Sequence, residues 1–396
     1  MKDIKPLKTA IIGCGMISNI YIRNLKNLFQ IIDLYALCDI SNAAAEEKAK
    51  TYGIEHVMTL DEVEQSSSIE LVVNLTGPDV HYNIIKRMLL AGKHVFTEKM
   101  LASNLEEGSE LLQIARDREL YLGVAPDTVL GAGIQTARKV LDAGMIGAVT
   151  SCLASVNRNQ ALNSELFPFI RKSIAGAFPY DVGVYYVASL LALLGPVKEV
   201  SGMAARIGEH QKELLFKEIQ EDSWQMPGID LLAGTMVFEN GVIGSVHFNG
   251  NSINEEQSLI RIYGKEGILE IGNPNAFNSY VKLIHAESGE CIIPFTHGYS
   301  GEVLLDNPTQ FEEMYGHRGV GAAEMAWAIR MKRKNRCSKE FGFHTMEVLY
   351  GMEEASKQKK NYEMTSTFQF IPLQSGYMST VFHGFKRGDA ERSLII

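Results

Sequence analysis

The hydrophobic and polar positions of the first 125 residues switch repeatedly between short apolar runs and three- or four-residue steps. Apolar runs typical of buried strands end near residues 12, 37, 75, 96 and 124. Stretches with helical spacing lie between them, as in residues 16–28, 41–52 and 78–91. Strands that alternate with helices predict a doubly wound parallel sheet, in which ligands bind where the strands end.

The first junction between a strand and a helix carries the turn sequence I-I-G-C-G-M-I-S. Gly13 and Gly15 let the backbone turn sharply and approach a ligand closely. Free N–H groups and the dipole of the following helix favour an anion, so we expect Met16 and Ile17 to line a dinucleotide phosphate together with the glycines. Ser18 replaces the third glycine of the dinucleotide fingerprint, and a small residue there still permits close packing of helix and strand.

Asp39 follows the second predicted strand. In a dinucleotide fold, an acid about 20 residues after the glycines accepts hydrogen bonds from the adenosine ribose. A carboxylate repels a 2′-phosphate, and the next residues, I-S-N, offer no arginine or lysine to neutralise one. The sequence therefore favours NAD over NADP. In the alternative interpretation the turn is an ordinary one and Asp39 caps the next helix.

Polar residues also follow the later strands of this half. Asn74 lies at the end of the third long apolar run, Thr76 and His81 follow that run, and Glu98 and Lys99 come after the fourth. We expect all five to lie at the cofactor edge of the sheet, because the ends of parallel strands meet there. Two alternatives stay open. In the first, His81 satisfies the free hydrogen-bonding groups in the first turn of its own helix. In the second, Lys99 is a surface lysine that pairs with Glu98.

After residue 126 the sequence predicts a helix at 133–143, and beyond residue 147 the pattern changes, because turn signals separate short alternating runs. The predicted strands are residues 149–156, 233–238, 242–249, 258–263, 268–271, 281–284 and 291–295. We expect one helix at 181–194 and a helical tail at 319–358 that is broken near Asn335. This indicates an α+β domain on a largely antiparallel open sheet. We assign residues 1–126 to a dinucleotide-binding Rossmann domain and 127–396 to a substrate-binding and oligomerisation domain, with C-terminal helices that pack back on the first.

Composition narrows the class of protein. The 396 residues carry 38 Lys and Arg against 47 Asp and Glu, a net charge of −9, which argues against nucleic acid as a partner. No apolar stretch approaches the length of a membrane span, and no signal peptide is evident. Five cysteines without paired spacing favour a reducing compartment, so we expect a cytoplasmic protein. The histidines have no metal-ligand spacing, and we expect no metal.

Six segments together resemble the Gfo/Idh/MocA family of glucose–fructose oxidoreductases and inositol dehydrogenases. They are I-I-G-C-G-M-I-S, N-L-T-G-P-D-V-H, A-G-K-H-V-F-T-E-K-M, G-V-A-P-D-T-V-L-G-A-G-I-Q-T-A-R, D-V-G-V-Y-Y-V-A-S-L-L-A-L-L-G-P-V and I-R-I-Y-G-K-E-G-I-L-E-I. The resemblance spans nearly the whole chain. It implies a nicotinamide cofactor, hydride exchange at a carbon bearing a hydroxyl, usually on a sugar or cyclitol, and a homodimer or homotetramer formed through the second sheet.

The resemblance also implies roles for single residues. Lys99 matches the lysine of the family's E-K-P motif, which hydrogen-bonds the substrate hydroxyl and helps to move its proton. Asp181 matches the acid of the D-x-G-x-H motif, although it would also suit a helix N-cap. Tyr185 stands where the family often has its catalytic histidine. A tyrosine beside a lysine acts as an acid or base if its pKa is lowered, whereas the alternative is a core tyrosine.

One further departure is Met100, which replaces the proline of E-K-P and is expected only to loosen the turn. We also expect the pKa of Lys99 to fall with burial. The sequence thus predicts an NAD(P)-dependent oxidoreductase that acts on a ring hydroxyl carbon of a sugar, cyclitol or glycoside. Two alternatives remain. One is a glycoside hydrolase or lyase that retains NAD and works through a transient keto-sugar, and the other is a non-catalytic dinucleotide sensor.

Overall fold

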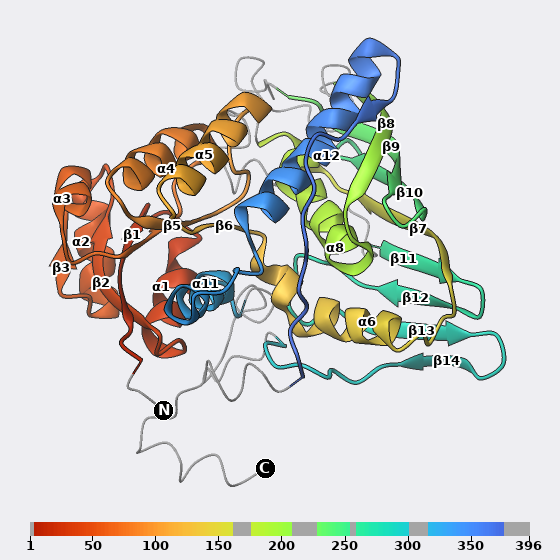
Figure 1. Cartoon of the computed structure of the whole chain (residues 1–396), viewed down its shortest axis with the longest axis horizontal. Coiled ribbons are helices and arrows are strands. Elements are labelled where there is room, and N and C mark those ends of the chain that lie inside the picture. Colours follow the sequence, from red (N-terminus) through yellow and green to blue (C-terminus); the bar gives the residue numbers. More distant parts are fainter. Residues whose placement is uncertain (1–3, 161–175, 208–227, 254–258, 301–315, 376–396) are drawn as a thin grey trace, which may run out of the picture.

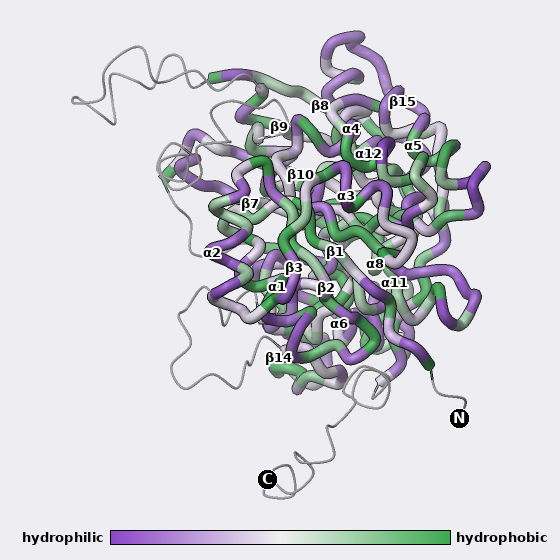
Figure 2. The backbone as a smooth tube through the Cα atoms, turned by 90° about the vertical axis from the view of Figure 1, so that its left-hand side faces the viewer, coloured by the Kyte–Doolittle hydropathy of each residue, from purple (hydrophilic) through white to green (hydrophobic). Residues whose placement is uncertain are grey.

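The computed structural model describes residues 4–160, 176–207, 228–253, 259–300 and 316–375. Two sheets organise these residues, one at each side of the molecule in Figure 1. In Figure 2 the hydrophobic stretches run through the middle of the molecule, and many of the hydrophilic ones lie at its periphery. No helix within the described residues is long and apolar enough to cross a membrane.

The first sheet has six parallel strands in the order β3-β2-β1-β4-β5-β6. Its strands are β1 (Leu7–Ile12), β2 (Ile32–Cys38), β3 (His56–Val57), β4 (Leu71–Asn74), β5 (His94–Thr97) and β6 (Leu122–Val124). The strand order reverses between β1 and β4, which is the place where a doubly wound sheet binds its ligand. The predicted doubly wound parallel sheet is confirmed.

Helices cover both faces of this sheet. They are α1 (Ser18–Asn27), α2 (Asn42–Tyr52), α3 (Leu60–Gln65), α4 (His81–Leu90) and α5 (Leu105–Asp117), with a 3-10 turn, η1 (Pro78–Val80), before α4. Figure 1 shows α4 and α5 on one face and α1 on the other. Local chemistry sets the helix ends: the Asn104 side chain accepts from the N–H of Glu107 to cap α5, and Gly53 ends α2 at φ +64°.

The second sheet has nine strands in the order β14-β13-β12-β11-β7-β10-β9-β8-β15. They are β7 (Val149–Asn157), β8 (Val197–Ala205), β9 (Leu231–Phe238), β10 (Ile243–Asn249), β11 (Leu259–Gly264), β12 (Gly267–Ile271), β13 (Val281–His285), β14 (Gly289–Ile292) and β15 (Tyr362–Glu363). Among the strand pairs of this sheet within the described residues, β7 and β10 alone are parallel, so the predicted, largely antiparallel sheet is confirmed. The sequence missed β8, whose polar residues hide the strand alternation.

The remaining helices join the two sheets. They are the 3-10 turn η2 (Asp127–Leu130), α6 (Ala132–Asp142), the π turn η5 (Pro179–Gly183), α8 (Val184–Leu194), α11 (Val320–Met331) and α12 (Lys339–Gln358). Every residue of α8 is buried, so this helix forms part of the core. α11 returns to the first sheet, where Arg330 pairs with Glu70 at 2.7 Å. η2 contacts α11 on one side and α8 on the other, so it lies at the junction of the two sheets (Figure 1).

Candidate active site

The turn after β1 has the geometry that a bound nucleotide requires. Gly13 has φ +101°, and a Cβ there would lie 2.6 Å from the carbonyl carbon of Leu75. Only glycine fits this position, because both the backbone angle and the neighbouring backbone exclude a side chain. A Cβ on Gly15 would meet no atom within 4 Å, so open space faces this second glycine. The turn thus has one closed and one open side.

The open side presents backbone N–H groups. α1 begins at Ser18, slightly later than the apolar pattern predicted, and the Ser18 hydroxyl donates to the carbonyl of Gly15 at 2.6 Å. Among the described residues, no backbone hydrogen bond uses the N–H of Gly15, Met16 or Ile17. Donors at the N-terminus of a helix suit a pyrophosphate, so these residues fit a dinucleotide.

Asp39 closes the turn from the end of β2. Its carboxylate accepts from the backbone N–H of Cys14 at 2.7 Å and from that of Ser41 at 2.8 Å. The capping role considered for Asp39 belongs to Ser41, whose hydroxyl accepts from the N–H of Ala44. A carboxylate has about four lone-pair sites, so Asp39 keeps acceptor capacity for a ribose hydroxyl.

Asn74 and Thr76 continue this edge of the sheet. Ile12 pairs with Asn74 in the β1–β4 register, and Asn74 pairs with Thr97 in the β4–β5 register. The Asn74 amide donates to the Thr97 hydroxyl at 3.1 Å and accepts from the Thr76 hydroxyl at 2.8 Å. The residues that follow β1, β4 and β5 therefore form one continuous edge, and Lys99 lies two residues beyond β5.

His81 joins two loops of this edge. Its Nδ1 lies 2.6 Å from the carbonyl oxygen of Met100, and its Nε2 lies 2.9 Å from that of Thr76. Burial lowers the pKa of His81. Met100, which was expected to loosen this turn, is only 2% exposed and its carbonyl contacts His81. The Lys99–Met100 peptide bond is cis.

Lys99 reaches across to the second domain. Its Nζ donates to the Asp181 carboxylate at 2.6 Å and to the Asp181 carbonyl at 2.9 Å. The alternative pairing of its ammonium with Glu98 is not found, since Glu98 instead accepts from the backbone N–H of Lys99 at 3.2 Å. The Lys99 side chain is 13% exposed, which leaves it partly open to a small molecule.

Asp181 and Tyr185 are four residues apart and both contact Lys99. Asp181 lies inside the π turn η5, so it is not the N-cap of α8; Gly183 takes that place. The Lys99 Nζ lies 5.4 Å from the centre of the Tyr185 ring. The structure therefore brings together the three residues predicted to handle the proton, at the end of the edge that begins with Gly13.

Two charged residues that the sequence did not identify, Arg318 and Asp127, lie beside this group. Arg318, just before α11, is 1% exposed and pairs with the fully buried Asp127 at 3.2 Å. Its guanidinium also donates to the Tyr185 hydroxyl at 3.2 Å and to the Asn275 side-chain oxygen at 2.5 Å. The Tyr21 hydroxyl donates to Glu98 at 2.6 Å. No local signal separates Arg318 from a solvated arginine.

The electrostatics differ from expectation. Burial alone would lower the pKa of the Lys99 ammonium, but the nearby Asp181 and Tyr185 outweigh it and the pKa is raised. The expected fall with burial is therefore wrong. Burial raises the pKa of the Tyr185 phenol, although Arg318 and Lys99 act in the opposite direction. Near neutral pH, Lys99 is thus an ammonium and Tyr185 a protonated phenol, which are both proton donors.

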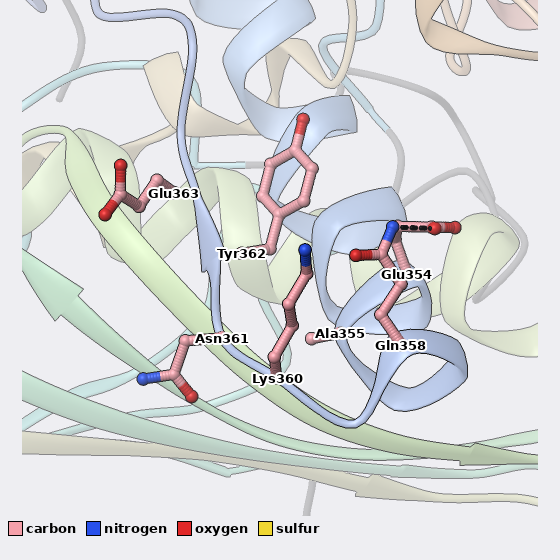
Figure 3. Close-up of a pocket in the computed structure, with 7 residues that line it drawn as sticks. All are labelled: Glu354, Ala355, Gln358, Lys360, Asn361, Tyr362 and Glu363. Carbon is pink, nitrogen blue, oxygen red and sulfur yellow. Dashed lines mark hydrogen bonds between the residues drawn. The ribbon is translucent and has the colours of Figure 1, made fainter.

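A separate hollow of about 490 Å³ lies where α12 ends beside β15 (Figure 3). Its lining comes from that helix end and that edge strand, and consists of Glu354, Ala355, Gln358, Lys360, Asn361, Tyr362 and Glu363. None of the predicted site residues lines it. Among the described residues, no three His, Cys, Asp or Glu side chains gather as metal ligands.

Comparisons with known proteins agree with this geometry. Residues 7–125 match the oxidoreductase family with an NAD-binding Rossmann fold, and residues 134–270 match the Gfo/Idh/MocA C-terminal domain. Scyllo-inositol 2-dehydrogenase (NADP⁺) of Bacillus subtilis is 24% identical over 68% of this chain and 74% of its own length. An uncharacterised oxidoreductase of Schizosaccharomyces pombe is 27% identical over 54% of this chain, and the match spans only 58% of that relative.

Solved structures share the fold across almost the whole chain. Levoglucosan dehydrogenase, in complex with NADH and levoglucosan, superposes with a TM-score of 0.75 at 18% identity. The superposition covers 91% of this chain and 99% of that enzyme. At this identity the likeness establishes the arrangement of the two domains and not the substrate.

Proposed function

The chain belongs to the Gfo/Idh/MocA family of NAD-binding oxidoreductases, and from this premise we propose that it transfers a hydride between nicotinamide and a ring hydroxyl carbon. The observation that carries the proposal is the contact of Lys99 with Asp181 and Tyr185 at the end of the cofactor edge. The cofactor supplies or takes the hydride, so the protein must orient the substrate and handle one proton. The proposed substrate is a sugar, cyclitol or glycoside, as the names of the inositol and levoglucosan dehydrogenases suggest.

Each member of the group has a distinct proposed role. Asp181 holds the Lys99 ammonium through two hydrogen bonds, which leaves the third N–H for a substrate oxygen. Tyr185 is the proposed proton donor when a carbonyl is reduced, and its phenolate is the acceptor when a hydroxyl is oxidised. Because burial raises the pKa of Tyr185, oxidation is expected to accelerate as the pH rises above neutral.

We propose NAD as the preferred cofactor. The Asp39 carboxylate stands at the end of β2, where a ribose hydroxyl would be received and a 2′-phosphate repelled. The structure adds one cation in this region, since the Lys48 ammonium hydrogen-bonds the Asn19 side chain on α1. The proposed preference rests on Asp39, and Lys48, which keeps its charge, is the second residue that bears on it.

The test is purified protein with NAD or NADP against a panel of sugars, inositols and glycosides, with cofactor absorbance and product mass followed together. Net reduction of the cofactor and a product two mass units lighter, the two hydrogens lost on oxidation of an alcohol, are the expected result. Bond cleavage without net reduction would replace the dehydrogenase with the NAD-retaining hydrolase or lyase. Tight NAD binding without turnover on any member of the panel would favour the sensor.

Assembly and location belong to the same proposal. Met203 on β8 is 77% exposed and Ile243 on β10 is 56% exposed, so apolar side chains stand on the second sheet. We propose that this sheet pairs in a homodimer or homotetramer, which light scattering after size exclusion would measure.

All five cysteines are free, and four are buried, which supports a reducing cytoplasm.

A further inference from the structure

Arg318 connects four distant parts of the chain at the candidate active site. Its guanidinium contacts Asp127 in η2, Asn275 in the β12–β13 loop and Tyr185 in α8. The backbone carbonyl of Arg318 accepts from the Asn24 amide of α1 at 2.8 Å. Asp127 in turn accepts from the backbone N–H of Gly319 at 2.8 Å. The side chain is thus fixed on several sides and has one orientation toward Tyr185.

The contact with Tyr185 has a defined direction. A guanidinium only donates hydrogen bonds, so the Tyr185 oxygen must accept from Arg318. No other hydrogen bond of Tyr185 occurs among the described residues, and its own O–H therefore points to no protein acceptor there. Tyr185 is 7% exposed and Lys99 lies over its ring, so this O–H is available where Lys99 offers its third N–H.

We propose that Arg318 is a positioning residue that directs the Tyr185 proton toward the substrate and stabilises the phenolate once that proton has moved. This inference rests on the proposed function. During reduction, a bound reduced nicotinamide would give up one C–H bond as hydride, which forms the new C–H bond at the carbonyl carbon, while the Tyr185 O–H bond breaks. The proton passes to the carbonyl oxygen, and the phenolate stays beside Arg318 until solvent reprotonates it. Oxidation follows the same steps in reverse.

Other charges also face Tyr185, namely Lys99, Glu98 and Asp181. Lys99 lies 5.4 Å from the ring centre, and its ammonium is already hydrogen-bonded to Asp181. The two carboxylates oppose ionisation of the phenol. Arg318 alone among them donates directly to the phenol oxygen, at 3.2 Å. An opposite charge at such a distance favours the charged form by about tenfold or more in the ionisation constant.

Tyrosinate absorbance tests the ionisation without any substrate. The chain has 15 tyrosines, so the titration of Tyr185 is obtained as the difference between a protein and its Tyr185→Phe variant. Arg318→Gln is expected to raise the midpoint of this difference titration by about one pH unit or more. Arg318→Lys, which keeps the charge, should recover part of the shift. Arg330→Gln, which removes an arginine paired with Glu70, should leave the midpoint unchanged.

An unchanged midpoint in Arg318→Gln would overturn the proposal, as would an equal shift in Arg330→Gln. If Arg318→Gln does not fold because Asp127 is left unpaired, the double variant Arg318→Gln/Asp127→Asn removes both charges, and the same shift is expected. Once the panel gives a substrate, the alkaline limb of kcat/KM for oxidation should move upward with the midpoint. A silent panel would reject the proposed function, while the titration would still decide the role of Arg318.

Discussion

The glycine turn and the charged group around Tyr185 lie at the same edge of the first sheet but are assembled differently. The turn uses consecutive residues from Gly13 onward and one acid at the end of the next strand. The charged group collects Lys99, Asp181 and Arg318 from segments up to 219 positions apart in the chain. Local chemistry therefore shapes the proposed cofactor turn, whereas the fold itself must assemble the groups that we propose to handle the proton.

The first prediction separates the charged group from the glycine turn by comparing the reaction rate with the affinity for NAD. Lys99→Met should lower kcat/KM by about 10²–10⁴-fold, the usual contribution of a positioned acid or base, with little change in NAD affinity. The measurement is steady-state kinetics together with a fluorescence titration of NAD. Lys86→Met is the matched control, since Lys86 also pairs with a carboxylate at 2.6 Å but lies on α4. Unchanged turnover in Lys99→Met would remove Lys99 from the mechanism.

This contrast explains how far the sequence could be interpreted. Gly13, Asp39 and the ends of the parallel strands were accessible because each depends on neighbours close in the chain. Lys99, Asp181 and Tyr185 were reached through the family resemblance, which supplied the long-range contact that the residues alone did not. Arg318 and Asp127 were missed because a buried ion pair between positions 191 residues apart leaves no periodic signal.

The raised pKa of Lys99 was missed for the same reason. The apolar residues around Lys99 in the sequence indicate that it is buried. The sign of its pKa shift, however, depends on which charges lie near it in the fold. Asp181 faces Lys99 only after η5 has packed against the end of β5. Strand β8 was missed for a local reason, because its polar residues obscure the alternation of apolar and polar positions by which a strand is predicted.

The second prediction uses stability to test whether the charged group also supports the fold. Asp127→Asn leaves the buried Arg318 without a counter-charge and should lower the free energy of unfolding by about 3–5 kcal/mol. Urea denaturation measures the loss. Glu70→Gln is the control, because its pair with Arg330 is partly exposed and should contribute no more than about 1 kcal/mol. Equal losses in the two variants would mean that Asp127 is already protonated, the direction in which burial moves its pKa.

The third prediction breaks the turn and spares the charged group. Gly13→Ala places a Cβ against the backbone of Leu75 at a positive φ, which should cost about 2–4 kcal/mol and abolish tight NAD binding. Gly15→Ala is the matched control for stability, since its Cβ would meet open space. The difference in unfolding free energy between these two variants is the measurement. Equal stability would contradict the close approach of Gly13 to the strand end.

The fourth prediction concerns cofactor choice and has the smallest effect. Asp39→Ser should weaken NAD binding by roughly tenfold and improve NADP relative to NAD, because it removes a charged acceptor and the repulsion of a 2′-phosphate. Cys14 and Ser41 lose an acceptor as well, which affects both cofactors equally, so the ratio of their affinities is the informative quantity. Asp33→Ser, an exposed acid on β2, controls for net charge.

A ratio that stays constant in Asp39→Ser would move the choice of cofactor away from β2. Lys48 would then be the residue to replace, because its ammonium hydrogen-bonds Asn19 of α1 and carries the charge that a 2′-phosphate requires. Losing NADP binding in Lys48→Met but not in Asp39→Ser would show that helix α2, rather than the strand end, reads the ribose. Cofactor binding at the glycine turn would then depend on the contact between α1 and α2. The turn would also need residues that are distant in the chain, and it would differ less from the charged group around Tyr185.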